Sequence, residues 1–211
     1  MYALLQSIRA YPTAYVILLA AVAICVFAWA KALQAGRRRQ AKKQALIAVL
    51  EHEKKLREEF CDAALTQQKL IDTPPERLVE GLSTNIQLWM ERQKDLRAAF
   101  DALPTPKRLI YALGYVVQDG REGLGMFFRK NGQPLTGAAL EAVKLLTSDV
   151  FCALFQKEYD AFDEENETVS LAQEQIDCQD RKFSALKEEQ GEALYATAKT
   201  YILENSVVFL P

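Results

Sequence analysis

The amino-terminal part of the chain contains one long, uncharged apolar run. It covers Thr13–Ala30, eighteen residues that read TAYVILLAAVAICVFAWA. In a helix that rises about 1.5 Å per residue, this run spans roughly 27 Å, close to the ~30 Å hydrocarbon core of a bilayer. The pattern predicts a transmembrane helix over residues 12–33, preceded by a short extracytoplasmic stub at residues 1–11.

Basic side chains lie mainly on one side of this run. Arg9 precedes it, whereas Lys31 and a membrane-surface cluster follow it: Arg37, Arg38, Arg39, Lys42 and Lys43. Because basic flanks stay in the cytoplasm and attract anionic lipid, we expect a single-pass protein of the inner (cytoplasmic) membrane with its amino terminus outside. A cleaved signal peptide fits less well, since its basic residues precede a shorter apolar run; a buried soluble helix is the other alternative.

Residues 34–73 follow with a heptad-like pattern. Its positions are spaced alternately three and four residues apart: Leu46, Val49, Glu53, Leu56, Phe60, Ala63, Gln67 and Leu70. This spacing predicts one long helix with a seam along one face. The seam either packs on the domain that follows, which the weak Ala and Gln positions favour, or pairs with a second copy of the chain.

Residues 74–211 show apolar stripes at helical spacing and no alternating run long enough for a sheet. Pro74-Pro75 and Thr105-Pro106 each precede such a stripe, as expected where a helix begins. The stripe from Leu109 to Val117 is the most apolar and predicts a central helix. Further helices are expected from Thr136 or Gly137 to about Phe162 and from Val169 to Glu204. The predicted fold class is all-α: one transmembrane helix followed by a helical bundle.

An irregular stretch interrupts the predicted bundle between residues 119 and 137. It holds five of the nine glycines of the chain beside two phenylalanines. Glycines allow backbone conformations that other residues avoid, so we expect a structured loop with a short turn of helix. The residues assigned to this structural loop are Gly120, Gly123, Gly125, Phe127, Phe128, Asn131 and Gly132.

The charge of the chain is unevenly distributed. The net charge is −2, yet residues 147–211 carry 14 acidic and five basic side chains. An acidic carboxyl-terminal region argues against nucleic-acid binding and is suited to a basic protein partner. Within it, Glu164, Glu165 and Glu167 are the candidate partner-binding residues, although such a run is usually a solvated face.

The sequence offers no recognisable catalytic or metal-binding arrangement. His52 is the single histidine, and the four cysteines form no CxxC pair. The GxxxxGK[ST] phosphate loop is absent, and the glycines at 120, 123 and 125 follow no predicted strand. The prediction is therefore a protein that is not an enzyme and that has no cofactor and no metal.

The segment from Leu103 to about Phe162 resembles the DMP19-like family of DNA-mimic proteins. The residues that carry the resemblance are the Leu103-Pro104 lead-in, the run Gly123-Leu124-Gly125-Met126-Phe127-Phe128, and Asn131-Gly132. Arg121, Glu122 and Met126 stand where the family usually has Asn, Gly and Gln. The resemblance implies an all-helical, non-enzymatic domain over residues 74–211, in a family whose named member binds a DNA-binding protein through acidic side chains.

These observations lead to one main hypothesis and two alternatives. The main hypothesis is a membrane-tethered, cytoplasmic protein-interaction module that binds a partner through an acidic face. The first alternative is a small-ligand or nucleotide binder that uses the glycine-rich loop 119–132. The second is a structural scaffold that forms a homodimer through residues 46–70.

Overall fold

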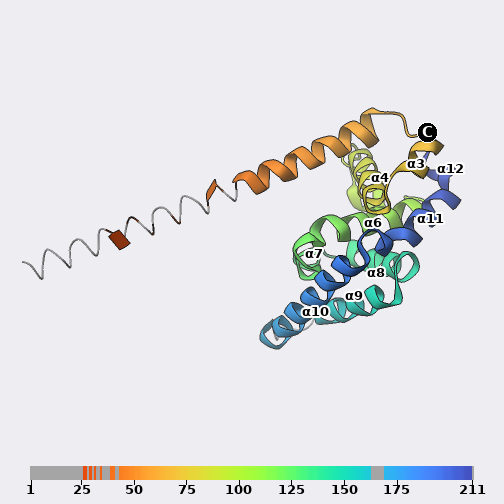
Figure 1. The fold of residues 1–211 in the computed structure, drawn as a ribbon. Helices are drawn as coiled ribbons and strands as arrows, with labels where there is room; N and C mark the ends of the chain where they lie inside the picture. The colour runs from red at the N-terminus through yellow and green to blue at the C-terminus, as the bar shows by residue number, and fades with distance from the viewer. Residues whose placement is uncertain are drawn as a thin grey trace, which may run out of the picture. The chain divides into compact units, whose positions relative to one another are not determined.

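The structure is a computed structural model that describes residues 26–27, 29, 31, 34, 39–40, 43–162 and 169–210, without the side chains of Glu122 and of residues 169–172. The chain divides into two units, residues 1–53 and residues 54–211. Both are helical, and the described residues contain no strand, which confirms the predicted all-α class (Figure 1).

The first unit is helical wherever it is described, including all of residues 43–53. Its large apolar side chains are exposed: Val26, Phe27, Trp29, Leu46, Ile47, Val49 and Leu50. Of the predicted membrane-surface cluster, Arg39 and Lys43 are described and exposed, whereas Arg37, Arg38 and Lys42 lie outside the described residues.

The predicted inner-membrane localisation is contradicted. In the part of the chain that the structure describes, no helix combines the length and the apolar character needed to cross a bilayer. The longer helices of the second unit are amphipathic, with buried apolar residues on one face and charged residues on the other. Of the predicted span Thr13–Ala30, only Val26, Phe27 and Trp29 are described, and the rest lies outside the described residues.

The second unit is a bundle of short helices. Their bounds are η1 Glu58–Asp62, α3 Gln67–Asp72, α4 Pro75–Met90, α5 Leu96–Asp101, α6 Thr105–Asp119, η2 Gly120–Glu122, α7 Leu124–Lys130, α8 Leu135–Leu146, α9 Asp149–Ala161, α10 Val169–Gln190, η3 Gly191–Tyr195, α11 Ala196–Glu204 and α12 Ser206–Phe209. The central helix predicted after Leu103-Pro104 is α6, which packs against both α4 and α8, while α9 pairs with α10.

Three of the predicted helices are divided by local caps. The heptad helix ends at Asp62, because Ala63 is extended and the Thr66 side chain caps α3 by accepting the Lys69 N–H. Ser148 accepts the Phe151 N–H and so separates α8 from α9. Gly191 has φ of 50° and ends α10. The apolar pattern continues across these positions, so it predicts one helix where a single capping residue or glycine ends one helix and starts the next.

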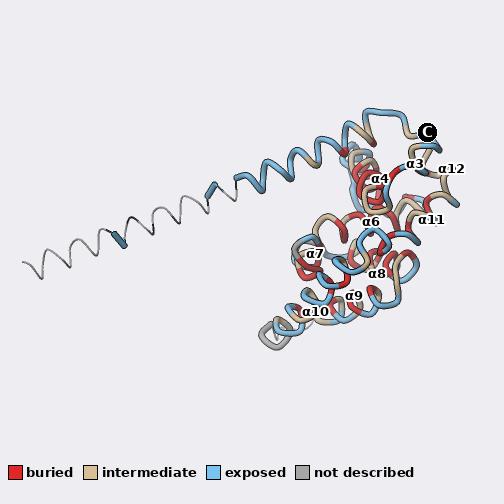
Figure 2. Tube along the Cα trace, in the orientation of Figure 1, coloured by how far each residue is buried: buried red, intermediate tan, exposed pale blue. Residues whose placement is uncertain are grey.

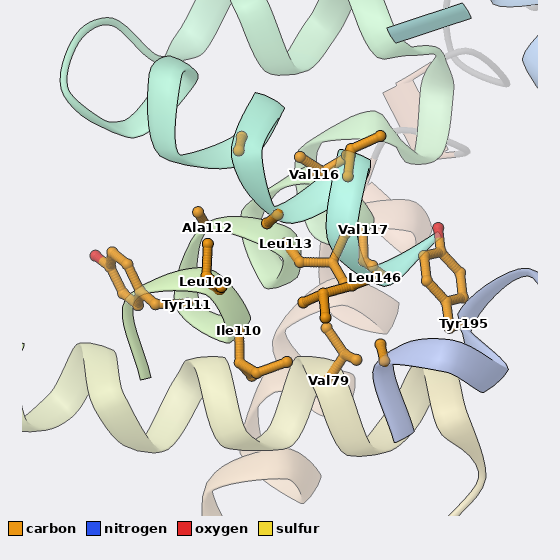
Figure 3. Close-up of a cluster of buried hydrophobic side chains, with 14 of the residues drawn as sticks. Val79, Leu109, Ile110, Tyr111, Ala112, Leu113, Val116, Val117, Leu146 and Tyr195 are labelled. Atoms are coloured by element: carbon orange, nitrogen blue, oxygen red, sulfur yellow. The ribbon is translucent and has the colours of Figure 1, made fainter. Parts of the chain in front are cut away.

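The core of the second unit lies around α6. Leu109, Ile110, Leu113 and Val116 are all fully buried. Figure 3 shows these side chains in one cluster with Val79 of α4 and with side chains of the neighbouring helices. Burial is concentrated along the inner faces of α4, α6, α8 and α9, whereas residues 43–50 are exposed along their whole length (Figure 2).

The heptad seam is split by this arrangement. Leu56, Phe60 and Leu70 are buried in the second unit, and the Phe60 ring lies where a side chain on Gly81 would be. Leu46 and Val49 are exposed. The seam therefore serves the intramolecular core only from Leu56 onward.

The carboxyl-terminal helices close the bundle against its first helices. α11 packs on α3, α4 and α8. From α11, the Lys199 ammonium donates to the carbonyl oxygens of Ile71 at 2.5 Å and Thr73 at 2.8 Å. The turn between α3 and α4 is thus held by a residue more than a hundred positions later in the chain.

Candidate functional site

The glycine-rich stretch is an ordered connection built from η2 and α7. Gly123 joins the two with φ of 130°, a conformation that side chains other than glycine rarely adopt. At the far end of α7, the Asn131 amide donates to Asp119 at 2.9 Å and the Lys130 ammonium lies 2.7 Å from the same carboxylate. The predicted structured loop with a short helical turn is therefore present, and its two ends are tied together.

Helix α10 closes the inner side of this connection. The Asp180 carboxylate accepts the Gly125 N–H at 3.0 Å, at the first turn of α7. A Cβ atom on Gly123 would lie 2.5 Å from the Asp180 carboxyl carbon, and one on Gly125 would lie 2.7 Å from an Ile176 methyl group. Because Gly123 and Gly125 have no side chains, Asp180 and Ile176 of α10 can occupy the space beside them.

A second carboxyl group, Glu158 of α9, lies beside Asp180 and is completely buried. Burial, followed by repulsion from Asp180, raises the pKa of Glu158 to about 9, against a weaker opposing effect of the Arg129 guanidinium. At neutral pH Glu158 therefore keeps its proton.

Helix α4 holds the outer side of the connection. The Arg121 guanidinium of η2 pairs with the buried Glu80 carboxylate at 2.5 Å. One turn earlier on α4, Glu76 lies 3.4 Å from the Lys187 ammonium of α10.

The Tyr195 hydroxyl is buried without a hydrogen-bond partner among the described residues, and burial together with Glu76 and Glu80 raises its pKa. This tyrosine stays protonated and belongs to the core.

The two phenylalanines of the stretch are core residues. Phe127 is fully buried, and its ring centroid lies 5.7 Å from that of Phe155. Phe128 stacks on Phe162 at 5.3 Å, and the Arg129 guanidinium covers the Phe162 ring at 5.9 Å. Because these rings pack on one another, they offer no free face for stacking a planar ligand.

An open, mainly apolar hollow lies elsewhere on the second unit. It has a volume of about 400 Å³ and is lined by Met90, Leu96, Arg97, Phe100, Tyr111, Gln133, Pro134 and Leu135. Met90, Phe100 and Tyr111 form buried walls, whereas Leu96 is 57% exposed. The Tyr111 hydroxyl donates to Tyr115 at 3.3 Å, and Arg97 pairs with Asp101 at 3.2 Å. The hollow thus joins apolar walls to a rim where the Arg97 guanidinium already has Asp101 as a partner.

A second hollow, of about 500 Å³, is polar. Glu59, Lys69 and Arg77 line it, and they bind one another: Arg77 pairs with Glu59, and the Lys69 ammonium donates to the Glu59 carbonyl oxygen. Lys69 and Arg77 therefore each have a partner within the wall, although the three residues together carry one net positive charge.

The other predicted site residues are placed as follows. Glu164, Glu165 and Glu167 lie outside the described residues. Gly120 is buried and Gly132 exposed at the two ends of the η2–α7 connection. Among the described residues, no group of His, Cys, Asp and Glu could hold a metal ion. The described cysteines, Cys61, Cys152 and Cys178, are unpaired thiols.

Sequence reasoning missed the carboxylates around the glycine-rich connection. Glu158 follows Phe151 and Phe155 at helical spacing, so an acid on an apolar stripe was the signal for its burial. Asp180 gave no such signal, because it lies in a mostly polar stretch and its contact with Gly125 spans 55 positions.

No family model, curated protein or solved structure matches this chain. The resemblance to the DMP19-like family therefore remains a prediction based on the residues of the 103–162 segment.

Proposed function

We propose that this chain is a helical protein-interaction module that holds an apolar side chain of a partner protein in the hollow between α4, α5, α6 and the start of α8. The observation that carries the proposal is the hollow itself, about 400 Å³ with buried Met90, Phe100 and Tyr111 as its walls. Binding sites are typically concave, mainly apolar and marked by a few polar groups.

The size and lining of the hollow favour one kind of occupant. A leucine- or phenylalanine-sized side chain occupies part of such a space and gains about 1.5–3 kcal/mol from burial. Arg97, which lies at the rim and is exposed, is suited to a carboxylate on the same partner segment. We therefore propose a short peptide segment with one large apolar residue next to an acidic one.

The placement of the acidic groups supports an interaction role over a catalytic one. Glu158 keeps its proton but is fully buried, so no substrate reaches it in this structure. Glu80 is buried and paired with Arg121. A general acid or base must lie within hydrogen-bond reach of its substrate, and neither of these two groups meets that requirement.

The alternative of a ligand site in the glycine-rich loop receives less support. A phosphate at such a loop uses free backbone N–H groups at the start of a helix. At α7 the Gly125 N–H already donates to Asp180, and Asp180 also occupies the space beside Gly123. A nucleotide would have to displace α10 to bind there.

The test is a selection for binding peptides with a matched pair of variants. The full chain is used to select peptides from a random display library, and the enriched peptides are synthesised for fluorescence anisotropy. Leu96→Glu places a charge at the mouth of the hollow, whereas Leu145→Glu changes a leucine of nearly equal exposure (56%) that does not line it.

We expect the enriched peptides to share a large apolar residue and to lose about tenfold or more in affinity to the Leu96→Glu chain, with less than about a twofold change for Leu145→Glu. A library that yields no enriched peptide, or peptides that bind the Leu96→Glu chain as well as the unchanged chain, would refute the proposal.

A further inference from the structure

The described helix of the first unit, residues 43–53, carries apolar side chains that are exposed. Leu46, Val49 and Leu50 lie at helical spacing on one side of it and are 59%, 43% and 55% exposed. Ile47, beside them, is 44% exposed. An isolated helix of this length is only marginally stable in water, so an apolar face on it calls for a packing partner.

The second unit limits which part of the seam a partner can use. Leu56, Phe60 and Leu70 are buried in that unit. Pairing through the whole of residues 46–70 would require the second unit to open. The available face therefore ends before Leu56, and it is centred on residues 46–50.

This apolar face has a basic residue at one end and an acidic residue at the other. Lys43 lies one turn before Leu46, and Glu53 lies one turn after Val49 and Leu50; at 3.6 residues per turn all of them share one side of the helix. Lys43 and Glu53 are both exposed. One end of the face is thus basic and the other acidic.

This order distinguishes the two ways in which two such helices can pair. In a parallel pair, Lys43 faces Lys43 and Glu53 faces Glu53, and both contacts are repulsive. In an antiparallel pair, Leu46 of one copy faces Leu50 of the other, and each Lys43 faces a Glu53. Within residues 43–53, only the antiparallel arrangement combines apolar contact with opposite charges at both ends.

We infer that the face formed by Lys43, Leu46, Val49, Leu50 and Glu53 binds a second copy of this chain in antiparallel orientation. The inference is independent of the proposed peptide-binding hollow, because none of these residues lines the hollow. It replaces the wider seam of residues 46–70 by one apolar patch between two ion pairs.

Sedimentation velocity of the full chain over a range of concentrations tests this inference. We expect a monomer–dimer equilibrium that Leu46→Glu abolishes and that Leu145→Glu, at a leucine of similar exposure outside the face, leaves unchanged. Circular dichroism confirms that each variant keeps its helix content.

Charge reversal then tests the orientation. In the antiparallel pair, Glu53→Lys faces Lys43 and raises the dimer Kd about tenfold, and the double change Lys43→Glu/Glu53→Lys restores it to within about threefold. A parallel pair would be insensitive to Glu53→Lys, since one like-charge contact replaces another. A chain that is monomeric throughout, a dimer that survives Leu46→Glu, or a dimer insensitive to Glu53→Lys would overturn the inference.

Discussion

The η2–α7 connection is flanked by a buried carboxyl group on each side, and the two carboxyl groups are stabilised in different ways. On the α4 side, the buried Glu80 carboxylate is balanced by the Arg121 guanidinium. On the α10 side, Asp180 is satisfied by a backbone N–H and the neighbouring Glu158 keeps its proton instead of gaining a cation. The first solution pairs a buried carboxylate with a cation, whereas the second depends on a proton and therefore on pH.

The largest expected effect comes from the proton on Glu158. The unfolded carboxyl has a pKa near 4.5 and the folded one a pKa of about 9, so the folded state holds one more proton between these values. The contribution of this proton to the free energy of unfolding is therefore fully present below about pH 4.5. It falls as pH rises towards 9, by up to ~1.4 kcal/mol per pH unit. Glu158→Gln, which is neutral at every pH, should remove this component of the slope.

The measurement is the free energy of unfolding by urea from pH 5 to pH 8. We expect the Gln variant to gain stability relative to the unchanged chain as pH rises. Asp160→Asn, at an exposed acid of the same helix, is the control and should leave the slope as it is. Parallel pH profiles for the Gln variant and the unchanged chain would show that Glu158 ionises normally in the fold.

A smaller effect is expected from filling the space between Gly123 and Asp180. Gly123→Ala places a methyl group against the carboxylate and forces a positive φ on alanine, at a cost of about 2–4 kcal/mol. Gly191→Ala is the matched control, because Gly191 also has a positive φ but no atom lies within 4 Å of its Cβ position. Gly191→Ala should cost about 1 kcal/mol. Equal losses in urea denaturation would mean that the close approach of α10 contributes nothing.

The α4 side is tested by removing its cation. Arg121→Met keeps most of the side-chain volume but takes the guanidinium from the buried Glu80, and we expect a loss of about 1–3 kcal/mol. Thermal denaturation of the variant and of the unchanged chain measures this loss. A variant as stable as the unchanged chain would show that the guanidinium does not stabilise this side of the connection.

The smallest expected effect is that of Asp180→Asn. The asparagine carbonyl still accepts the Gly125 N–H, while the negative charge that raises the pKa of Glu158 disappears. The pKa of Glu158 should then be less raised, so the free energy of unfolding stops falling at a lower pH. We expect the variant to be more stable than the unchanged chain by about 1 kcal/mol or less at pH 8. Asp177→Asn, one turn away and exposed, provides the comparison for the melting temperature.

Local sequence signals were enough to predict the all-α class and the central helix, but not the breaks within three longer predicted helices or the contacts of α10. The stripe from Leu109 to Val117 predicted the central helix, because one face of a helix must be apolar to be buried on neighbouring helices. The carboxylate side of the connection could not be predicted, because Gly123 and Asp180 are far apart in sequence and neither is apolar. The inner-membrane localisation was wrong, and the hollow at Gln133-Pro134 escaped notice because its walls come from four separate segments.

The contacts of α11 have a consequence for the order of events during synthesis. Lys199 and its helix secure the turn at residues 71–73 and pack on α4, which leave the ribosome well before them. Part of the apolar surface of the early helices therefore stays uncovered until α11 has emerged from the ribosome. This protein is accordingly expected to complete its fold late, and nascent chains stalled before that point should recruit chaperones.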